Sequence, residues 1–195
     1  MIELEAMVKA FQPHRGQAIV VSGRANRYWD TMSQLPQRDL SLGDPAMGGH
    51  AAFALGLALA QPKQKVIVFD SDGDLQMSLG VLAMVAEQKP SNFYHFLLDN
   101  ECYATTGGQP VPNAKSIAYD VVAKGCGYPL AYAYNNLESL SVNLARILSE
   151  PGPVFVAMKI VPEITNTPIG QRTPRLKRTK DQSIADLRKE LGIRE

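Results

Sequence analysis

Two apolar segments separated by one amphipathic segment constrain the fold more than any other feature of this sequence. Residues 65–69 and 92–98 are rich in Val, Ile, Phe and Leu, as buried strands are. Between them, apolar residues recur at the three- and four-residue spacing of a helix: Leu75, Leu79, Leu82, Val85 and Ala86. Pro90 ends that pattern. We therefore predict one helix between two strands, and the usual right-handed crossover makes the strands parallel.

Acidic and amide side chains follow both predicted strands. The first strand runs into the sequence DSDGD at 70–74, and the second runs into DNEC at 99–102. If the strands are neighbours, their carboxyl ends lie about 5 Å apart, so Asp72 and Asn100 can point into one crevice. Open α/β sheets bind ligands in such crevices. Carboxylate and amide oxygens suit a small hard cation that also binds phosphate oxygens, and Gly73 would let a phosphate approach the backbone.

Segment 70–74 also allows two other interpretations. An EF-hand calcium loop counted from Asp70 would need glycine at Leu75 and glutamate at Val81, so this sequence does not fit that loop. A plain turn at the end of a strand uses the same Asp and Gly residues. These residues alone leave the turn and the metal site both open.

The spacing of these residues resembles the Gly-Asp-Gly…Asn signature of thiamine diphosphate enzymes. Asp72-Gly73 is followed, twenty-eight positions after Asp72, by Asn100. In that family the Asp and Asn side chains and a backbone carbonyl two residues beyond the Asn bind Mg²⁺. The resemblance therefore implies three metal ligands: Asp72, Asn100 and the backbone carbonyl of Cys102. The cofactor-binding positions that it implies in these segments are Gly73, Asp74, Asn100 and Tyr103.

Two residues depart from the signature. Ser71 stands where the family has its first Gly, and Asp74 stands where the family commonly has Ser or Ala. A further carboxylate close to a diphosphate is unfavourable because like charges repel. We therefore expect Asp74 either to turn away from the diphosphate or to meet a cation.

Two more segments narrow the resemblance to phosphonopyruvate and sulfopyruvate decarboxylases. Residues 105–110, TTGGQP, are similar to a Thr-Gly-Gly-Gln-Pro run in those enzymes, and residues 43–60 are similar to their Gly-Ser-Met-Gly…Gly-Ile-Ala-Leu run. This similarity implies that Met47 holds the cofactor in a bent form and that the carbonyl of Pro45 accepts its 4′-amino hydrogen bond. By residue type alone, Met47 also fits core packing. His50 falls one place beyond a histidine of some relatives and is left unassigned.

Composition and charge describe an ordinary globular chain. The 195 residues fit one domain, with 45% hydrophobic and 20% charged residues. The net charge of +1 gives no case for binding nucleic acid or a membrane. No apolar run is long enough to span a bilayer, and the charged amphipathic N-terminus does not resemble a signal peptide, so we expect a cytoplasmic protein. Cys102 and Cys126 are too few for a disulfide framework.

Strands and helices are predicted to alternate along the rest of the chain. Further strands are expected at 17–21, 39–42, 130–134 and 153–160, and further helices at 2–11, 27–33, 51–60, 116–124, 136–148 and 183–191. Helix 51–60 is apolar on all sides and should be buried or pressed against another subunit. Helix 116–124 should turn Ile117, Val121 and Val122 inward. The alternation predicts an α/β fold, a doubly wound parallel sheet with helices on both faces, which is the thiamine diphosphate-binding fold that the resemblance implies.

We expect residues 1–165 to form the domain that binds the diphosphate and Mg²⁺, and residues 166–195 to form a basic arm with a short helix. The arm either lies on a partner or is a solvated tail. Within the family, a complete site also needs a pyrimidine-binding domain, which supplies an activating Glu. No second sheet domain is predicted here, so that Glu is expected on a separate partner subunit, in a hetero-oligomer such as a dimer of heterodimers. No catalytic residue is assigned within this chain.

The predicted function is the diphosphate-binding subunit of a thiamine diphosphate-dependent 2-oxo-acid decarboxylase, a lyase active only with its partner. Its substrate would be a small acid similar to sulfopyruvate or phosphonopyruvate, for which Arg24 and Arg27 are candidate anion ligands. Two alternatives stay open. One is the β subunit of a 2-oxo-acid oxidoreductase or a carboligase, and the other is a non-catalytic assembly or regulatory relative.

Overall fold

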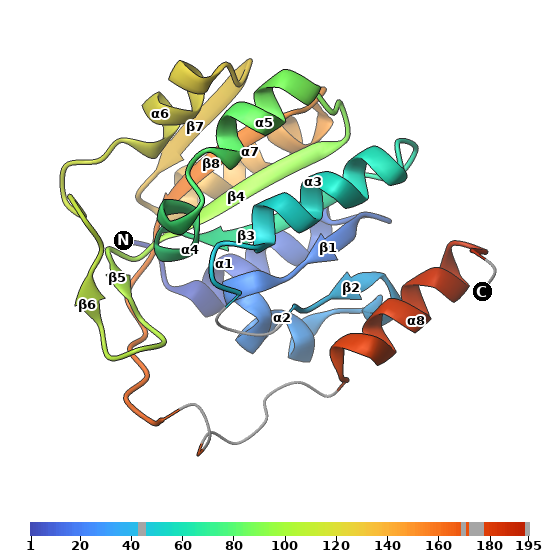
Figure 1. Ribbon diagram of the computed structural model, residues 1–195, viewed down its shortest axis with the longest axis horizontal. Coiled ribbons are helices and arrows are strands. Elements are labelled where there is room, and N and C mark those ends of the chain that lie inside the picture. Colours follow the sequence, from blue (N-terminus) through green and yellow to red (C-terminus); the bar gives the residue numbers. More distant parts are fainter. Residues whose placement is uncertain (43–45, 169–170, 172–177, 194–195) are drawn as a thin grey trace.

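A parallel sheet forms the centre of the protein in a computed structural model that describes residues 1–42, 46–168, 171 and 178–193. Within these residues, six strands pair in the order β2-β1-β3-β4-β8-β7, and helices cover both faces (Figure 1). The strands are β1 Ile19–Val21, β2 Asp39–Leu40, β3 Val66–Ser71, β4 Phe93–Asp99, β7 Leu130–Tyr134 and β8 Val154–Lys159. Every strand pair in this sheet is parallel. The predicted doubly wound α/β fold is therefore confirmed.

The helices divide between the two faces of the sheet. Their bounds are α1 Leu4–Phe11, α2 Asn26–Met32, α3 His50–Ala60, α4 Asp72–Met77, α5 Val81–Gln88, α6 Tyr119–Cys126, α7 Leu137–Ser149 and α8 Lys180–Glu190. Buried side chains of α1, α2 and α7 belong to one core cluster, and those of α3, α5, α6 and α8 belong to the other. Helix α7 begins as predicted, because the Asn136 side chain accepts a hydrogen bond from the Ser139 N–H.

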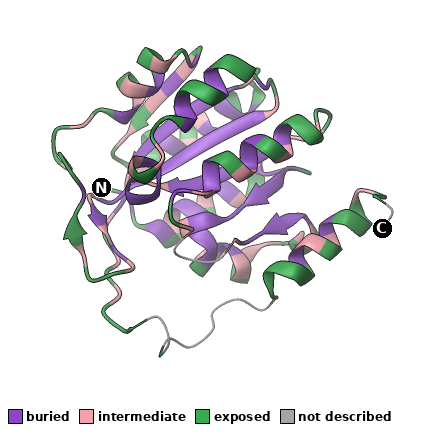
Figure 2. Ribbon diagram, viewed as in Figure 1, coloured by how far each residue is buried: buried purple, intermediate pink, exposed green. Residues whose placement is uncertain are grey.

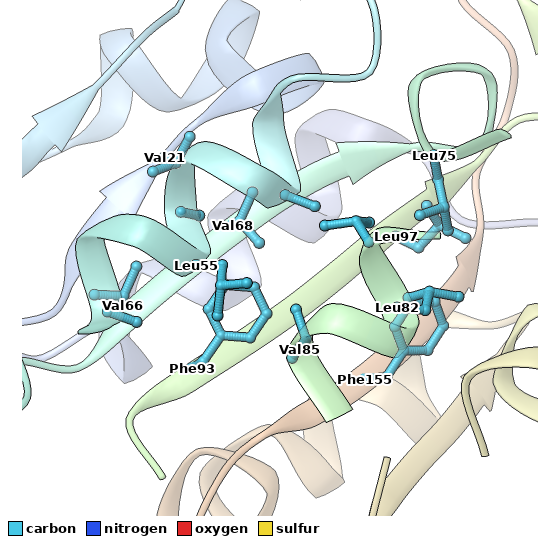
Figure 3. Packing of buried hydrophobic residues seen from close by; sticks show 14 of the residues in the cluster. Val21, Leu55, Val66, Val68, Leu75, Leu82, Val85, Phe93, Leu97 and Phe155 are labelled. Atoms are coloured by element: carbon cyan, nitrogen blue, oxygen red, sulfur yellow. The ribbon is translucent and has the colours of Figure 1, made fainter. Parts of the chain in front are cut away.

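Alternation along the strands supplies both core clusters. In β3, Val66 and Val68 face one cluster, whereas Ile67 and Phe69 face the other. Figure 3 shows Val66 and Val68 packing with Leu55 of α3 and Phe93 of β4. Strands β1, β2, β3, β4 and β8 are largely buried, edge strand β7 is only partly buried, and the outer surfaces of the helices are exposed (Figure 2). Each fully buried side chain of this kind contributes about 1.5–3 kcal/mol to folding, so the central strands hold the site-bearing strand ends rigidly.

The prediction of one helix between β3 and β4 was wrong. Segment 72–88 holds two helices, α4 and α5, separated by a turn at 78–80. Leu75 and Leu82 are buried on either side of the turn, but Leu79 lies within it and is partly exposed. The turn lies against a second loop, because a Cβ added to Gly48 would come within 2.5 Å of the Ser78 Oγ. The helix is therefore interrupted where residue 78 packs against the loop at Gly48, and the spacing of the apolar residues does not indicate this interruption.

The predicted helix at 116–124 starts three residues later, at Tyr119, and faces the core differently. Tyr119 and Ala123 are its buried residues, whereas Val121 is 61% exposed. The inward position predicted for Val121 was therefore wrong. Ile117 and Val122 are partly buried against the core, as expected. Helix α3, which was predicted to be apolar on all sides, is buried along only part of its surface in this chain. Its Leu59 remains 46% exposed.

Helix α8 packs on its own chain at the edge of the sheet. Leu187 is 5% exposed and belongs to the core cluster of α3 and α5. Glu190 pairs with Arg38 across 3.1 Å between Oε1 and Nη1, and an Arg178 Nη2 donates to the Asp39 carbonyl at 3.2 Å. The helix thus packs along edge strand β2 of its own chain and is not a loose tail, while contact of this segment with a partner stays a prediction. Arg172, Arg175 and Lys177 lie outside the described residues, and the domain division at 165 stays a prediction.

Among the residues that the structure describes, no helix is long and apolar enough to cross a membrane.

Candidate functional site

The carboxyl ends of β3 and β4 lie side by side, as the sequence predicted. Their register pairs Asp70 with Leu97 and Ser71 with Leu98. A cavity of about 350 Å³ opens at this edge, a volume within the range of small-molecule sites. The predicted site residues that line the cavity are Met47, Gly73, Asp74, Asn100, Cys102 and Tyr103. Asp72 is fully buried one residue before Gly73. Residues from three separate segments are thus brought to one place.

Asp72 is a buried carboxyl with an unsatisfied oxygen. Its Oδ1 accepts a hydrogen bond from the Gly73 N–H at 3.0 Å, and its Oδ2 has no hydrogen-bond partner in the described part of the chain. Burial, with repulsion from the nearby Asp99, raises the pKa of Asp72 to about 7, although backbone N–H groups oppose the shift. A buried polar atom without a partner is costly, and a cation bound at Oδ2 would remove that cost.

Asn100 and Cys102 present further oxygen donors at the end of β4. The Asn100 Oδ1 accepts a hydrogen bond from the Cys102 N–H at 3.1 Å, and the Cys102 carbonyl accepts one from the Ala104 N–H at 3.0 Å. Each of these oxygens has a second lone pair. Glu101 between them has a left-handed φ of 65°, which folds the chain back at the strand end. The oxygen-only donor set of Asp72, Asn100 and the Cys102 carbonyl fits a hard divalent cation.

Asp99 is a site residue that the sequence analysis missed. It is 3% exposed, and its Oδ2 lies 2.9 Å from the Nζ of Lys159 at the end of β8. Lys159 also pairs with Glu101 across 2.9 Å between Nζ and Oε1. Burial raises the pKa of Asp99 despite this lysine. Its position directly before Asn100, at the end of a predicted strand, is the sequence feature that could have identified Asp99 as a site residue.

Gly73 is required by close packing against Tyr103. A Cβ added at this position would lie 2.8 Å from Cδ1 of the Tyr103 ring, so a larger residue would displace the ring. The Gly73 N–H bonds Asp72 Oδ1, and the Asp74 N–H donates to Ser71 Oγ at 3.2 Å. Both amides that the resemblance placed near a diphosphate thus make bonds within the chain. Ser71, which departs from the family signature, caps helix α4 through this contact.

Asp74 lines the cavity, and both of its carboxylate oxygens bond groups of the chain. Its Oδ2 lies 2.7 Å from the Nδ1 of His50, and its Oδ1 accepts a hydrogen bond from the Gly48 N–H at 3.0 Å. Burial acts to raise the pKa of Asp74, but the hydrogen bond and charge of His50 outweigh it and hold the pKa below its usual value. Of the two expected alternatives, the structure shows the second: the partner of Asp74 is the unassigned His50.

The histidine of this pair is supported from the core. The His50 Nδ1 lies 3.9 Å from Asp70 Oδ1, and Asp70 Oδ2 lies 3.2 Å from the Nε2 of His95. The candidate ligand atoms of His50, Asp70 and Asp74 lie within 4.8 Å of one another. All three side chains already have hydrogen-bond partners within the chain, so we describe them as a polar network. His95 is fully buried, and its ring bonds Asp70.

Met47 and Arg24 line the cavity, whereas Arg27 does not. Met47 is 65% exposed, has a φ of 51° and lines the cavity from the loop before α3. Pro45, predicted beside it, lies outside the described residues. Arg24 lines the cavity, and its Nη2 donates to the Glu163 carbonyl at 2.9 Å. Arg27 is more exposed and pairs with the Glu163 carboxylate at 3.1 Å. Of these two candidates, Arg24 is the one that reaches the cavity.

Comparison with known proteins identifies one family. The family model described as "Thiamine pyrophosphate enzyme, C-terminal TPP binding domain" matches residues 21–158. Over 150 residues the chain is 35% identical to a phosphonopyruvate decarboxylase of Streptomyces viridochromogenes, covering 77% of this chain and 37% of that protein. Over 124 residues it is 37% identical to a sulfopyruvate decarboxylase subunit beta of Methanothermobacter thermautotrophicus, covering 64% of this chain and 63% of that subunit.

A solved structure shares the fold. It is a thiamine diphosphate-dependent 4-hydroxybenzoylformate decarboxylase of Rhodococcus jostii, with a TM-score of 0.67 and 17% sequence identity. The match covers 85% of this chain and 33% of that one. At this identity the likeness concerns the fold. The chain spans little more than a third of the phosphonopyruvate decarboxylase that it matches.

Proposed function

The chain belongs to the thiamine pyrophosphate enzyme family, in its C-terminal TPP-binding domain, and from this premise we propose that it is the diphosphate-binding subunit of a 2-oxo-acid decarboxylase. The observation that carries the proposal is the fully buried Asp72 carboxyl, whose Oδ2 has no hydrogen-bond partner among the described residues. The names of the decarboxylases to which the chain is 35–37% identical support the reaction class.

Mg²⁺ would be held by Asp72, Asn100 and the backbone carbonyl of Cys102. All three ligands are oxygens, and Mg²⁺ bound by few protein ligands completes its octahedron with water and phosphate oxygens. The ion would also offset the repulsion between Asp72 and Asp99 that accompanies the raised pKa of Asp72. The chain thus supplies a preformed anionic pocket for the metal.

Thiamine diphosphate would occupy the cavity with its diphosphate beside Gly73, Asp74 and Tyr103. Met47 would lie against its rings and favour the bent form, and the Pro45 carbonyl would accept the 4′-amino hydrogen bond. When bound, this cofactor supplies the electron-accepting ring that allows CO₂ to leave a 2-oxo acid. Our chain's own contribution is to place the cofactor and to exclude water from its diphosphate end, since Asp72 and Asn100 are buried.

A partner subunit would hold the pyrimidine and provide the activating Glu. The word "beta" in the names of the sulfopyruvate decarboxylase relatives supports a hetero-oligomer, with a dimer of heterodimers as the simplest form. We propose a small acidic substrate similar to sulfopyruvate or phosphonopyruvate. Arg24, which lines the cavity, would bind either the anionic group of this substrate or the diphosphate of the cofactor. Residues 1–165 would carry the site. The free thiols of Cys102 and Cys126 agree with a cytoplasmic location.

The non-catalytic alternative rested on Ser71 and Asp74, the two departures from the family signature, because the Asp74 carboxylate would oppose a diphosphate. That carboxylate bonds His50 at 2.7 Å and the Gly48 N–H at 3.0 Å, and Ser71 caps helix α4, so both residues have a structural use in this fold. We therefore carry the decarboxylase forward as the proposed function.

Cofactor titration of the complex tests the proposal. The chain is co-purified with a pyrimidine-binding partner subunit, and thiamine diphosphate with Mg²⁺ is titrated by calorimetry. We expect saturable binding by the wild type, loss of binding in Asp72→Ala, and unchanged binding in Asp186→Ala, a residue of α8 whose carboxylate pairs with Arg178. CO₂ release from sulfopyruvate or phosphonopyruvate without an electron acceptor distinguishes a decarboxylase from an oxidoreductase. A wild-type complex that binds no cofactor would contradict the proposal.

A further inference from the structure

The loop that carries Met47 has a backbone that needs support. Met47 and Gly48 are consecutive residues with left-handed φ angles of 51° and 86°. Glycine adopts such angles readily, but methionine does so rarely, and its left-handed conformation must be stabilised by the surroundings. The loop also presses against α4, because a Cβ at Gly48 would come within 3.2 Å of the Asp74 carbonyl oxygen and of Met77 Cβ.

One carboxylate bonds the loop at two points. The Oδ1 atom of Asp74 accepts the Gly48 N–H at 3.0 Å, and its Oδ2 atom lies 2.7 Å from the ring Nδ1 of His50, the first residue of α3. Asp74 is 8% exposed and His50 is 1% exposed, so water competes little with either bond. The two bonds span the turn from Gly48 to His50. Asp74 also lies two residues beyond Asp72 on the short helix α4.

We propose that Asp74, with His50 as its hydrogen-bond partner, is a positioning residue that fixes the Met47 loop to α4. The pair would hold the residue that shapes the cofactor at a set position relative to the residue that binds its metal. The roles of Met47 toward the cofactor and of Asp72 toward the metal rest on the proposed function. The link between the loop and α4 does not, because its bonds are made within the chain. It also gives a use to the carboxylate that departs from the family signature.

The core side of the pair is also fixed. Asp70 at the end of β3 lies 3.9 Å from the His50 Nδ1 and bonds the buried His95 at 3.2 Å. Asp70 Oδ1 further accepts the Ser71 N–H at 2.8 Å. His50 is therefore placed between two carboxylates, one on each side of the metal ligand Asp72 in the sequence. This arrangement orients the imidazole toward Asp74 without help from a ligand.

Hydrogen exchange on the full chain, without cofactor or metal, tests the link directly. In Asp74→Ala the Gly48 N–H loses its acceptor, so exchange in segment 46–50 should rise by about tenfold, the effect of losing one hydrogen bond to a charged group. Asp74→Asn keeps the Oδ1 acceptor and should show a smaller rise. His50→Gln is a second variant should Asp74→Ala fold poorly. Asp186→Ala is the control and should leave this segment unchanged. Unchanged exchange in folded Asp74→Ala and His50→Gln would overturn the proposal.

A double-mutant cycle separates positioning from general stability. In the complex, the dissociation constant of thiamine diphosphate is measured for wild type, Asp74→Ala, Met47→Ala and the double variant. If Asp74 acts through Met47, the effects of the two substitutions should not add, because the two residues are coupled. Asp74→Ala should then weaken binding about tenfold in the wild-type background and less than about threefold in the Met47→Ala background. Additive effects would overturn the proposal. Failure of the wild type to bind cofactor would refute the proposed function, while the exchange experiment would still decide the link.

Discussion

At the scale of single residues, burial and Asp99 raise the pKa of the Asp72 carboxyl from 3.8 to about 7. At pH values between these two pKa values, Asp72 keeps its proton in the folded chain and releases it in the unfolded chain. A group with a raised folded pKa gives stability that is present at low pH and is lost as pH rises. One pKa unit corresponds to about 1.4 kcal/mol. The metal-free chain should therefore lose on the order of 4 kcal/mol of unfolding free energy between pH 4 and pH 8 through this group.

Urea unfolding at several pH values between 4 and 8, in the presence of a chelator, measures this loss. Asp72→Asn keeps the shape of the side chain and removes its titration, so its stability should fall much less with pH. Asp186→Asn, on the partly exposed α8, should follow the wild type. Asp99 has a pKa raised in the same direction and will leave a residual slope. Equal slopes in wild type and Asp72→Asn would show that Asp72 is not the titrating group.

The sequence predicted Asp72 and Asn100 because a motif fixes their spacing and parallel strands bring their ends together. It did not predict the partners of those residues. Asp74 bonds His50, which lies 24 positions away in the chain, and no local pattern shows where a carboxylate points. The unusual charge at Asp74 did indicate that a cation was needed. Asp99 was overlooked because neighbouring strand residues point to opposite faces, although its charge still acts on Asp72.

At the scale of elements, two glycines near and within α3 should respond oppositely to alanine. Gly48 has a φ of 86°, and an added Cβ would lie 2.5 Å from Ser78 Oγ. The left-handed conformation alone costs an alanine about 1–2 kcal/mol, so Gly48→Ala should lower the free energy of unfolding by about 2 kcal/mol. Gly56 lies inside α3 with nothing within 4 Å of an added Cβ. Gly56→Ala should raise stability by about 0.5–1 kcal/mol.

Thermal and urea unfolding of the two variants provide the measurement, with each variant serving as the control for the other. Similar effects of both substitutions would contradict the tight contact between the Gly48 loop and the turn after α4. That contact also explains the limit of prediction at this scale. Apolar spacing continues across segment 72–88 because Leu75, Leu82 and Val85 are all buried. The break at 78–80 accompanies packing against a loop distant in sequence, which periodicity does not record.

At the scale of the whole molecule, the family and the parallel sheet were predicted correctly from one motif and the alternation of strands and helices. Both follow from local patterns, and the family match over residues 21–158 confirms the resemblance. The place of the C-terminal helix was not predictable in this way. Lys180–Glu190 has few apolar residues, so its sequence resembles a solvated helix. The ion pair between Glu190 and Arg38 and the burial of Leu187 attach it to the sheet edge.

Leu187 tests this attachment. It is 5% exposed within a core cluster, so Leu187→Ala should lower the free energy of unfolding by about 2–3 kcal/mol, as buried leucine truncations do. Leu59→Ala is the matched control on α3, where the side chain is 46% exposed, and it should change stability by less than about 0.5 kcal/mol in the isolated chain. Urea unfolding compares the two. Equal, small effects would mean that α8 does not cover β2 in solution, and the helix would then be available to a partner subunit. A large effect of Leu187→Ala alone means that α8 protects an edge strand which would otherwise present unpaired backbone groups to other chains.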